Sequence, residues 1–210
     1  MIRKDIKEFI KTIPNDVTLV AATKYIDVDE MNELFRVGIT NFGENRVDSF
    51  LRKHSLINNR EITWHFIGHL QRNKAIEVIN KIDFLHSLDS LKLAKVIEDH
   101  CSKRLKCFVE VSINLEENKN GVPYYEVENF VRELQKFTKI ELVGFMMMAV
   151  KSSDGESLDS QFGKLRQLRD DIEKKLQIKI PYLSMGMSDD YKSALKEGAT
   201  HIRLGRILYI

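Results

Sequence analysis

Val17-Thr18-Leu19-Val20-Ala21-Ala22-Thr23 is followed directly by Lys24-Tyr25, and this segment gives the clearest indication of the fold. Its first seven residues are apolar or β-branched and include no residue that breaks a strand, which predicts a buried strand. An open, doubly wound α/β sheet would need a glycine-rich turn after this first strand. The turn here is Thr23-Lys24-Tyr25, so the stretch favours a closed barrel over the open sheet.

The rest of the chain alternates between strand-like and helical segments. Strand-like runs occur at residues 17–23, 39–43, 62–67, 83–87, 106–112, 141–149, 181–185 and 200–204. Amphipathic segments occur at residues 28–37, 45–53, 70–80, 89–103, 124–137, 157–176 and 189–197, with an extra N-terminal helix predicted at 2–12. This alternation predicts an α/β protein with a parallel sheet, and eight units close naturally into a (β/α)8 TIM barrel. No linker-like segment interrupts the pattern, so we expect residues 1–210 to form a single domain.

The composition is typical of a soluble intracellular protein. The 33 basic and 31 acidic residues nearly cancel, and a net charge of +2 gives no reason to expect nucleic acid as a partner. Cys101 and Cys107 form no CxxC motif and are expected to be reduced thiols. The first five residues lack the apolar segment of a secretory leader, and the longest apolar stretch, 143–150, is too short to span a bilayer. We therefore expect a cytoplasmic protein without membrane association. We also expect it to be a monomer.

Lys24 lies at the end of the first predicted strand, just before the acidic helix start at residues 27–30. An ammonium group at the mouth of an apolar strand has a low-dielectric wall behind it. That setting is typical of lysines that attack aldehydes such as pyridoxal phosphate. Taken alone, however, the segment is more typical of a solvated lysine at a strand end.

The loop after the seventh predicted strand has features of a phosphate site. Phosphates in (β/α)8 barrels favour the loops that follow strands seven and eight. Within residues 184–190, Gly186 lets the backbone approach a ligand closely. Ser188 is expected at the N-cap of the next helix, where its hydroxyl lies beside free backbone N–H groups that suit an anion.

The loop after the eighth predicted strand has matching features. Gly205 again permits close approach, and the flanking Arg203 and Arg206 supply fixed positive charge and directed donors. Each motif is weak on its own, because most turn glycines and arginines have no ligand. Their joint position on the last two strands of a barrel favours Lys24 as a residue that holds a ligand.

Two further strand ends carry polar side chains. Asn45 and Arg46 follow the second strand, where they could contact a ligand on the same face or cap the next helix, and both alternatives stay open. His65 and His69 are four residues apart, but Gly68 lies between them and no glutamate occupies the position of a zinc protease. We expect no metal site there; His65 is predicted to be a hydrogen-bonded barrel residue and His69 to lie on the ligand face.

Several of these motifs together resemble a known family. In order, they are Val20-Ala21-Ala22-Thr23-Lys24, Phe42-Gly43-Glu44-Asn45, Trp64-His65-Phe66-Ile67-Gly68-His69-Leu70-Gln71, His86-Ser87-Leu88-Asp89-Ser90, Ser184-Met185-Gly186-Met187-Ser188 and Arg203-Leu204-Gly205-Arg206. Over nearly the whole chain the sequence resembles the pyridoxal phosphate homeostasis proteins, single-domain relatives of the alanine racemase N-terminal barrel.

The resemblance implies fold type III binding of pyridoxal 5′-phosphate, with the cofactor as a Schiff base on Lys24. It further implies that Ser188, Gly205 and Arg206 bind the phosphate. Arg203 would face the pyridine nitrogen, and Asn45 would lie beside the ring. An arginine at that nitrogen would leave it unprotonated, so the ring would be a weaker electron sink.

The resemblance favours a non-enzymatic protein of vitamin B6 homeostasis that supplies or buffers pyridoxal phosphate, with apo forms of pyridoxal-phosphate enzymes as recipients. The alternative is an amino-acid racemase, which needs a base on each face of the substrate α-carbon. Lys24 could serve one face, while Tyr25, Tyr182 and Tyr191 are candidates for the other without support from spacing. A phosphosugar enzyme with a structural Lys24 is a third possibility, but paired carboxylates at the strand ends are lacking.

Overall fold

The computed structural model describes residues 1–113, 120–150 and 154–209. The described strands are β1 (Thr18–Ala22), β2 (Asn41–Glu44), β3 (Thr63–Phe66), β4 (Phe84–Leu88), β5 (Leu105–Ser112), β6 (Val122–Pro123), β7 (Ile140–Met146), β8 (Tyr182–Ser184) and β9 (His201–Leu204). The α-helices are α1 (Ile6–Lys11), α2 (Val28–Arg36), α3 (Val47–Leu56), α4 (Arg72–Val78), α5 (Leu91–His100), α6 (Val127–Leu134), α7 (Gly155–Leu176) and α8 (Tyr191–Lys196). Two short 3₁₀ turns are η1 (Tyr124–Glu126) and η2 (Arg206–Leu208).

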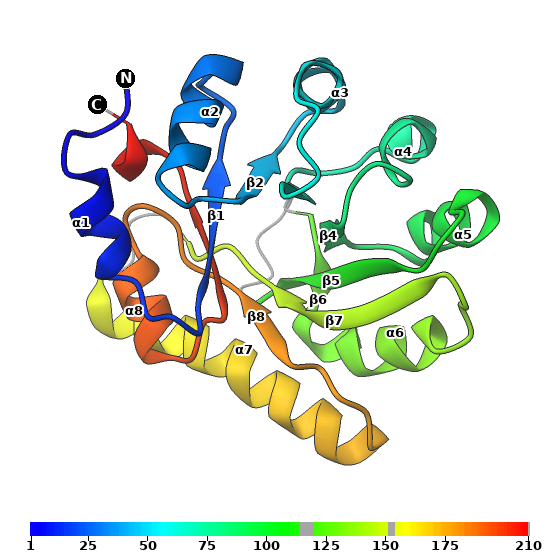
Figure 1. Ribbon diagram of the computed structural model, residues 1–210. Helices are drawn as coiled ribbons and strands as arrows, with labels where there is room; N and C mark the ends of the chain where they lie inside the picture. Colours follow the sequence, from blue (N-terminus) through cyan, green and yellow to red (C-terminus); the bar gives the residue numbers. More distant parts are fainter. Residues whose placement is uncertain (114–119, 151–153, 210) are drawn as a thin grey trace.

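Eight of the described strands form a closed barrel, which confirms the predicted fold (Figure 1). β1 lies between β2 and β9, with Ala21 opposite Phe42 and Val20 opposite Arg203. The order runs from β2 through β3 to β4 and from β9 through β8 and β7 to β5, and pairing of β4 with β5 closes the ring. These pairings are parallel, so the carboxyl ends of the strands meet at one mouth of the barrel.

Helices α2 to α8 lie around the outside of the strands (Figure 1). The predicted extra N-terminal helix is α1, which precedes β1 and lies near both ends of the chain. Ile2 and Tyr209 form an antiparallel bridge, so the first and last described segments lie side by side. None of the described helices is long and apolar enough to cross a membrane.

The structure differs from the predicted segments in where several of them begin and end, and in one additional strand. β7 ends at Met146, three residues before the end of the predicted run at 149. The two-residue β6 pairs with β5 outside the ring, with Val122 opposite Val111, and was not predicted. A strand of two residues is too short to produce any alternation in the sequence.

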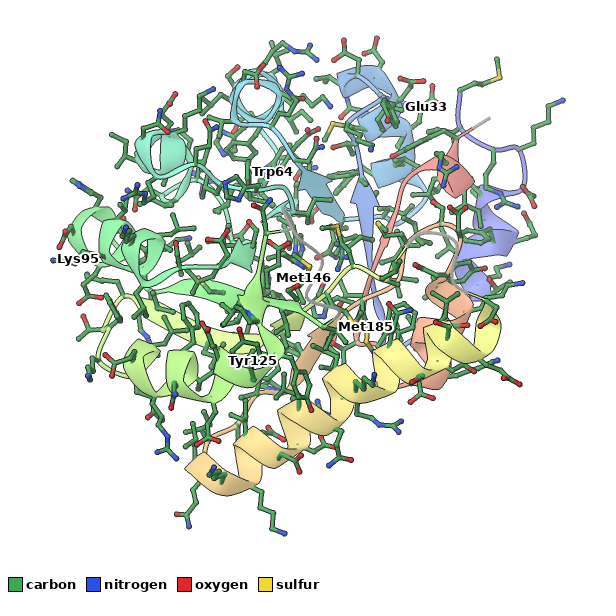
Figure 2. All side chains as sticks on the ribbon, turned by 180° about the vertical axis from the view of Figure 1, so that it is seen from behind. Glu33, Trp64, Lys95, Tyr125, Met146 and Met185 are labelled. Carbon is green, nitrogen blue, oxygen red and sulfur yellow. The ribbon has the colours of Figure 1, made fainter. Side chains whose placement is uncertain are left out.

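The apolar core has two parts. The larger cluster packs the strands against the surrounding helices, while Phe108, Val143 and Met146 form a small separate cluster. Figure 2 shows Met146 and Met185 near the middle of the molecule, whereas Glu33 and Lys95 lie on outer helices. Buried polar side chains also belong to the barrel strands; among them are Glu44, His65, His86, Glu110, Ser184, His201 and Arg203. The interior of the barrel therefore contains charged and hydrogen-bonding side chains in addition to apolar ones.

Candidate functional site at the carboxyl ends of the strands

A hollow of about 670 Å³ opens beyond the carboxyl ends of β1, β8 and β9. Its volume is in the range of small-molecule sites. It is lined by Ala22, Lys24, Tyr25, Ala149, Val150, Leu158, Met187, Ser188, Asp189, Asp190, Arg203, Gly205 and Arg206. The structure therefore brings together five of the six residues that the family resemblance assigns to the cofactor, although they come from opposite ends of the chain.

Lys24 is exposed at the rim of this hollow, in the turn that follows β1. Its Nζ lies 4.6 Å from the centre of the Tyr25 ring, and the face of an aromatic ring attracts a cation. The amine is thus accessible to small molecules in solution, whereas the backbone that carries it is firmly fixed.

A buried ion pair fixes that backbone. Lys53 Nζ donates to the carbonyl oxygen of Thr23 at 2.6 Å and to Glu44 Oε1 at 2.5 Å. Thr23 Oγ1 donates to the same carboxylate oxygen at 2.6 Å, and Thr23 N donates to the Gly43 carbonyl at 3.0 Å. All three side chains are essentially inaccessible. The peptide immediately before Lys24 is therefore anchored to both α3 and β2.

Ser188 lies in the loop after β8, and two backbone N–H groups converge on it. Gly205 N and Ile207 N each donate to Ser188 Oγ at 3.3 Å. The expected N-cap role of Ser188 is wrong, because α8 begins only at Tyr191 and Asp190 precedes it as the N-cap residue. Ser188 nevertheless lies beside backbone N–H donors, which belong to the turn after β9 rather than to α8 and which bind its hydroxyl oxygen.

Gly186 allows the backbone conformation of the same loop. Its φ of +94° lies in the left-handed region that side chains disfavour. A Cβ at this position would lie 2.7 Å from Ala194 Cβ and 2.9 Å from Tyr191 Cα. The sharp turn over α8 therefore requires glycine.

The two arginines of the last strand end differ in their surroundings. Arg206 is exposed and its guanidinium pairs with Asp189, whose side chain is also exposed. Such a surface pair contributes little stability, so Arg206 can readily exchange Asp189 for another anion. Arg203 is buried and forms the inner wall of the hollow.

Neutral oxygens hold the Arg203 guanidinium. Nη1 donates to the Ser184 carbonyl at 2.8 Å and to Ser184 Oγ at 2.7 Å, while Nη2 donates to the Met147 carbonyl at 2.9 Å. Burial lowers the pKa of Arg203 to about 10, and the charges of Glu110 and Asp190 oppose that shift. Arg203 is consequently still a cation at neutral pH.

Asn45 does not line the hollow, in contrast to the other five predicted residues. Its side-chain Oδ1 is buried without a hydrogen-bond partner among the described residues. The Asn45 backbone packs tightly against Gly68, because a Cβ on residue 68 would lie 2.2 Å from the Asn45 carbonyl oxygen. Arg46, the other polar residue of this strand end, is exposed and pairs with Asp48 at 3.0 Å.

His65 and His69 have separate environments. His65 is buried in the barrel interior, as predicted, whereas His69 is exposed and its Nδ1 lies 3.2 Å from Asp89 Oδ2. In the described part of the chain, His, Cys, Asp and Glu side chains form no group of three that could hold a metal ion. His69 and Asp89 line a second hollow of about 910 Å³, which is larger but has no lysine among its lining residues.

Sequence reasoning missed several polar groups near the site. Glu110 on β5 is 4% exposed, and burial raises its pKa to about 7. His201 on β9 is also buried, which lowers its pKa to about 4. His86 and Ser184 stood within the quoted motifs, but their spacing gave no indication of a role. Lys53 gave no signal at all, because an isolated lysine in an amphipathic helix is normally solvated.

The fold and the site together define a barrel of the alanine racemase type. The model of the alanine racemase N-terminal domain family matches residues 2–210, so the chain belongs to this family. The pyridoxal phosphate homeostasis protein of Aquifex aeolicus (strain VF5) is 35% identical over 202 residues, covering 93% of this chain and 87% of that protein. These matches confirm the resemblance found in the motifs.

Solved structures agree with this assignment. PipY of Synechococcus elongatus PCC7942 is 27% identical and superimposes with a TM-score of 0.94 without pyridoxal phosphate and 0.88 with it bound. Both comparisons cover all of the PipY chain and at least 98% of this one. An alanine racemase of Clostridium difficile 630 is 16% identical with a TM-score of 0.79, which shows the shared fold alone. This chain covers 57% of that racemase.

Proposed function

We propose that this protein binds pyridoxal 5′-phosphate, held covalently on Lys24, and takes part in intracellular vitamin B6 homeostasis by supplying or buffering the cofactor. One observation carries the proposal. A strand-end lysine shares a hollow with a hydroxyl, two converging backbone N–H groups and a buried arginine. The family relatives named for pyridoxal phosphate homeostasis, and PipY with the cofactor bound, support it.

The residues present fit this cofactor. The donors around Ser188 Oγ form a cradle for a phosphate group, and the exposed Arg206 can add positive charge. Arg203 would face the pyridine nitrogen and, having only N–H donors, would leave it unprotonated. Bound pyridoxal phosphate supplies an aldehyde that combines reversibly with amines. The unpartnered Asn45 Oδ1 is a further acceptor near this face.

The proposed role is that of a carrier rather than a racemase. Racemisation needs a second base opposite Lys24. Of the three tyrosines considered, Tyr191 is buried and Tyr182 does not line the hollow. Tyr25 does line it, but this residue is 70% exposed and its ring face lies against Lys24 Nζ. We propose apo pyridoxal-phosphate enzymes as recipients and a cytoplasmic monomer as the working form, without nucleic acid or membrane as partners.

Labelling of the lysine tests the proposal directly. The protein would be loaded with pyridoxal phosphate, reduced with borohydride and digested, and the peptides would be weighed. We expect the cofactor mass on the peptide that contains Lys24, and no stable visible absorption in Lys24→Ala. A label on another lysine, or no coloured complex with the parent protein, would contradict the assignment.

Two further measurements separate a carrier from an enzyme. The loaded protein should activate an apo pyridoxal-phosphate enzyme. It should not exchange the α-proton of L-alanine in deuterated water, as followed by NMR. Repeated turnovers of exchange that vanish in Lys24→Ala would instead establish a racemase.

A further inference from the structure

A continuous chain of hydrogen bonds, buried except at its partly buried Asn41 end, runs through the barrel from Arg203 to Asn41. Arg203 Nη1 lies 2.7 Å from Ser184 Oγ, which lies 2.8 Å from His86 Nδ1. His86 Nε2 lies 2.9 Å from His65 Nδ1, and His65 Nε2 lies 2.9 Å from Asn41 Oδ1. The five side chains come from five strands: β9, β8, β4, β3 and β2.

The amide oxygen at the Asn41 end sets the direction of these hydrogen bonds when both imidazoles are neutral. An amide oxygen only accepts, so His65 donates through Nε2 to Asn41 Oδ1, and its Nδ1 is then an acceptor. His86 therefore donates to His65 Nδ1 through its own Nε2, which leaves His86 Nδ1 as the acceptor of the Ser184 hydroxyl proton. At the other end the guanidinium has only donors, so Ser184 Oγ accepts from Arg203.

Both imidazoles are held neutral and rigid. Burial lowers the pKa of His65 and of His86 well below the usual value, so neither ring is protonated at neutral pH. The His65 ring stacks on Phe84 with 4.7 Å between ring centres, and the His86 ring stacks on Phe108 at 4.3 Å. Rings packed in this way cannot turn over easily to exchange their nitrogens.

We propose that His86 is a positioning residue for Arg203: by accepting the Ser184 hydroxyl proton, it presents a lone pair of Ser184 Oγ to the guanidinium and fixes this cation at the wall of the cofactor hollow. The inference rests on the proposed function in one respect, namely that Arg203 faces the cofactor. The aligned O–H and N–H dipoles point their negative ends toward Arg203. They thereby stabilise a buried positive charge whose hydrogen bonds go to neutral oxygens.

The donor–acceptor direction of this hydrogen-bond chain can be measured on the protein without cofactor. Long-range ¹H–¹⁵N NMR of histidine-labelled protein distinguishes the two neutral tautomers of each ring. We expect His65 and His86 both to carry their proton on Nε2 at neutral pH. A proton on Nδ1 of His86, or a doubly protonated ring, would overturn the proposal.

A double-mutant cycle tests whether His86 acts through Arg203. His86→Phe keeps an aromatic ring against Phe108 but removes both nitrogens. It should raise the dissociation constant of pyridoxal phosphate about tenfold, the scale of one lost charge-assisted hydrogen bond. In an Arg203→Lys background the same substitution should change the constant less than about twofold, because the partner is already gone.

His201→Phe is the matched control. The His201 ring also packs against Phe108, with 5.2 Å between ring centres, but its Nδ1 lies beside Thr200 Oγ1 and takes no part in the hydrogen-bond chain from Arg203 to Asn41. Its effect should be the same in both backgrounds. Equal effects of His86→Phe in the two backgrounds would show a merely structural role and overturn the inference. If the parent protein binds no pyridoxal phosphate, the proposed function is refuted instead. The histidine tautomers would still show the direction of the hydrogen bonds between Arg203 and Asn41.

Discussion

Replacement of Glu110 by glutamine should make the protein more stable at alkaline pH and leave it nearly unchanged at acidic pH. Glu110 lies on β5 opposite Met146, and the Gly121 backbone packs over it, so that a Cβ there would lie 3.3 Å from Glu110 Cγ. The carboxyl is 4% exposed. Burial raises its pKa from 4.5 to about 7; the charge of Asp89 adds to this shift and Arg203 opposes it.

The sign and size of the effect follow from proton linkage. Between pH 4.5 and about 7 the folded protein keeps the Glu110 proton that the unfolded chain has lost. Stability therefore falls as the pH rises through this window. A shift from 4.5 to about 7 corresponds to roughly 3 kcal/mol at 1.36 kcal/mol per pKa unit. The neutral glutamine resembles the protonated carboxyl, so Glu110→Gln should exceed the parent protein by about 3 kcal/mol at pH 8 and match it near pH 4.

Urea unfolding of both proteins from pH 4 to pH 8 measures this difference. The variant must be compared with the parent protein at each pH, because His201 also titrates in this range. Its pKa is lowered to about 4, so it makes stability rise with pH where Glu110 makes it fall. Glu98→Gln is the control, since a hydrogen bond from Lys139 N lowers the pKa of the Glu98 carboxyl and predicts a slope of opposite sign. A difference between Glu110→Gln and the parent that does not vary with pH would refute the reasoning.

Three other substitutions test the parts of the site. Ser188→Ala should weaken retention of pyridoxal phosphate by about 1–3 kcal/mol, the scale of a hydrogen bond to a charged group; an equal loss for pyridoxal, which lacks the phosphate, would contradict the phosphate assignment. Lys53→Met should lower the free energy of unfolding by about 3–5 kcal/mol, because it leaves Glu44 as a buried unpaired charge. Adding Glu44→Gln should restore part of this loss in urea unfolding, and no restoration would argue against the ion pair. Gly186→Ala should cost about 1–3 kcal/mol in thermal unfolding, whereas Gly155→Ala, which meets nothing within 4 Å, should not show this loss.

The barrel could be predicted because its signals are local. Each of the eight ring strands falls on a predicted apolar run, since strands buried on both faces read as continuous hydrophobic segments. The lack of glycine in the turn at Lys24 separated the barrel from the open sheet. The end of β7 and the short β6 could not be predicted, because they depend on pairing with β5 rather than on residue pattern.

The site could be predicted only where a barrel rule links position to role. Lys24, Ser188, Arg203, Gly205 and Arg206 follow strands that meet at one mouth, and the structure places them around one hollow. Their assigned roles toward the cofactor stay predictions. The buried partners could not be predicted, because they matter through contacts with residues distant in the chain: Lys53 with the Thr23 carbonyl, and His86 with His65 and Ser184.

The contrast between an exposed Lys24 and a buried Arg203 bears on how the site works. A catalyst of carbanion chemistry excludes water around the reacting carbon, so that fixed dipoles can stabilise the developing charge. Here Lys24, the proposed attachment point, lies open at the rim, while Arg203, which we propose to face the ligand, is anchored in the barrel. Incoming amines can therefore reach Lys24 without any opening of the fold. This division favours the exchange of a bound aldehyde over the transformation of a substrate, and it agrees with a carrier.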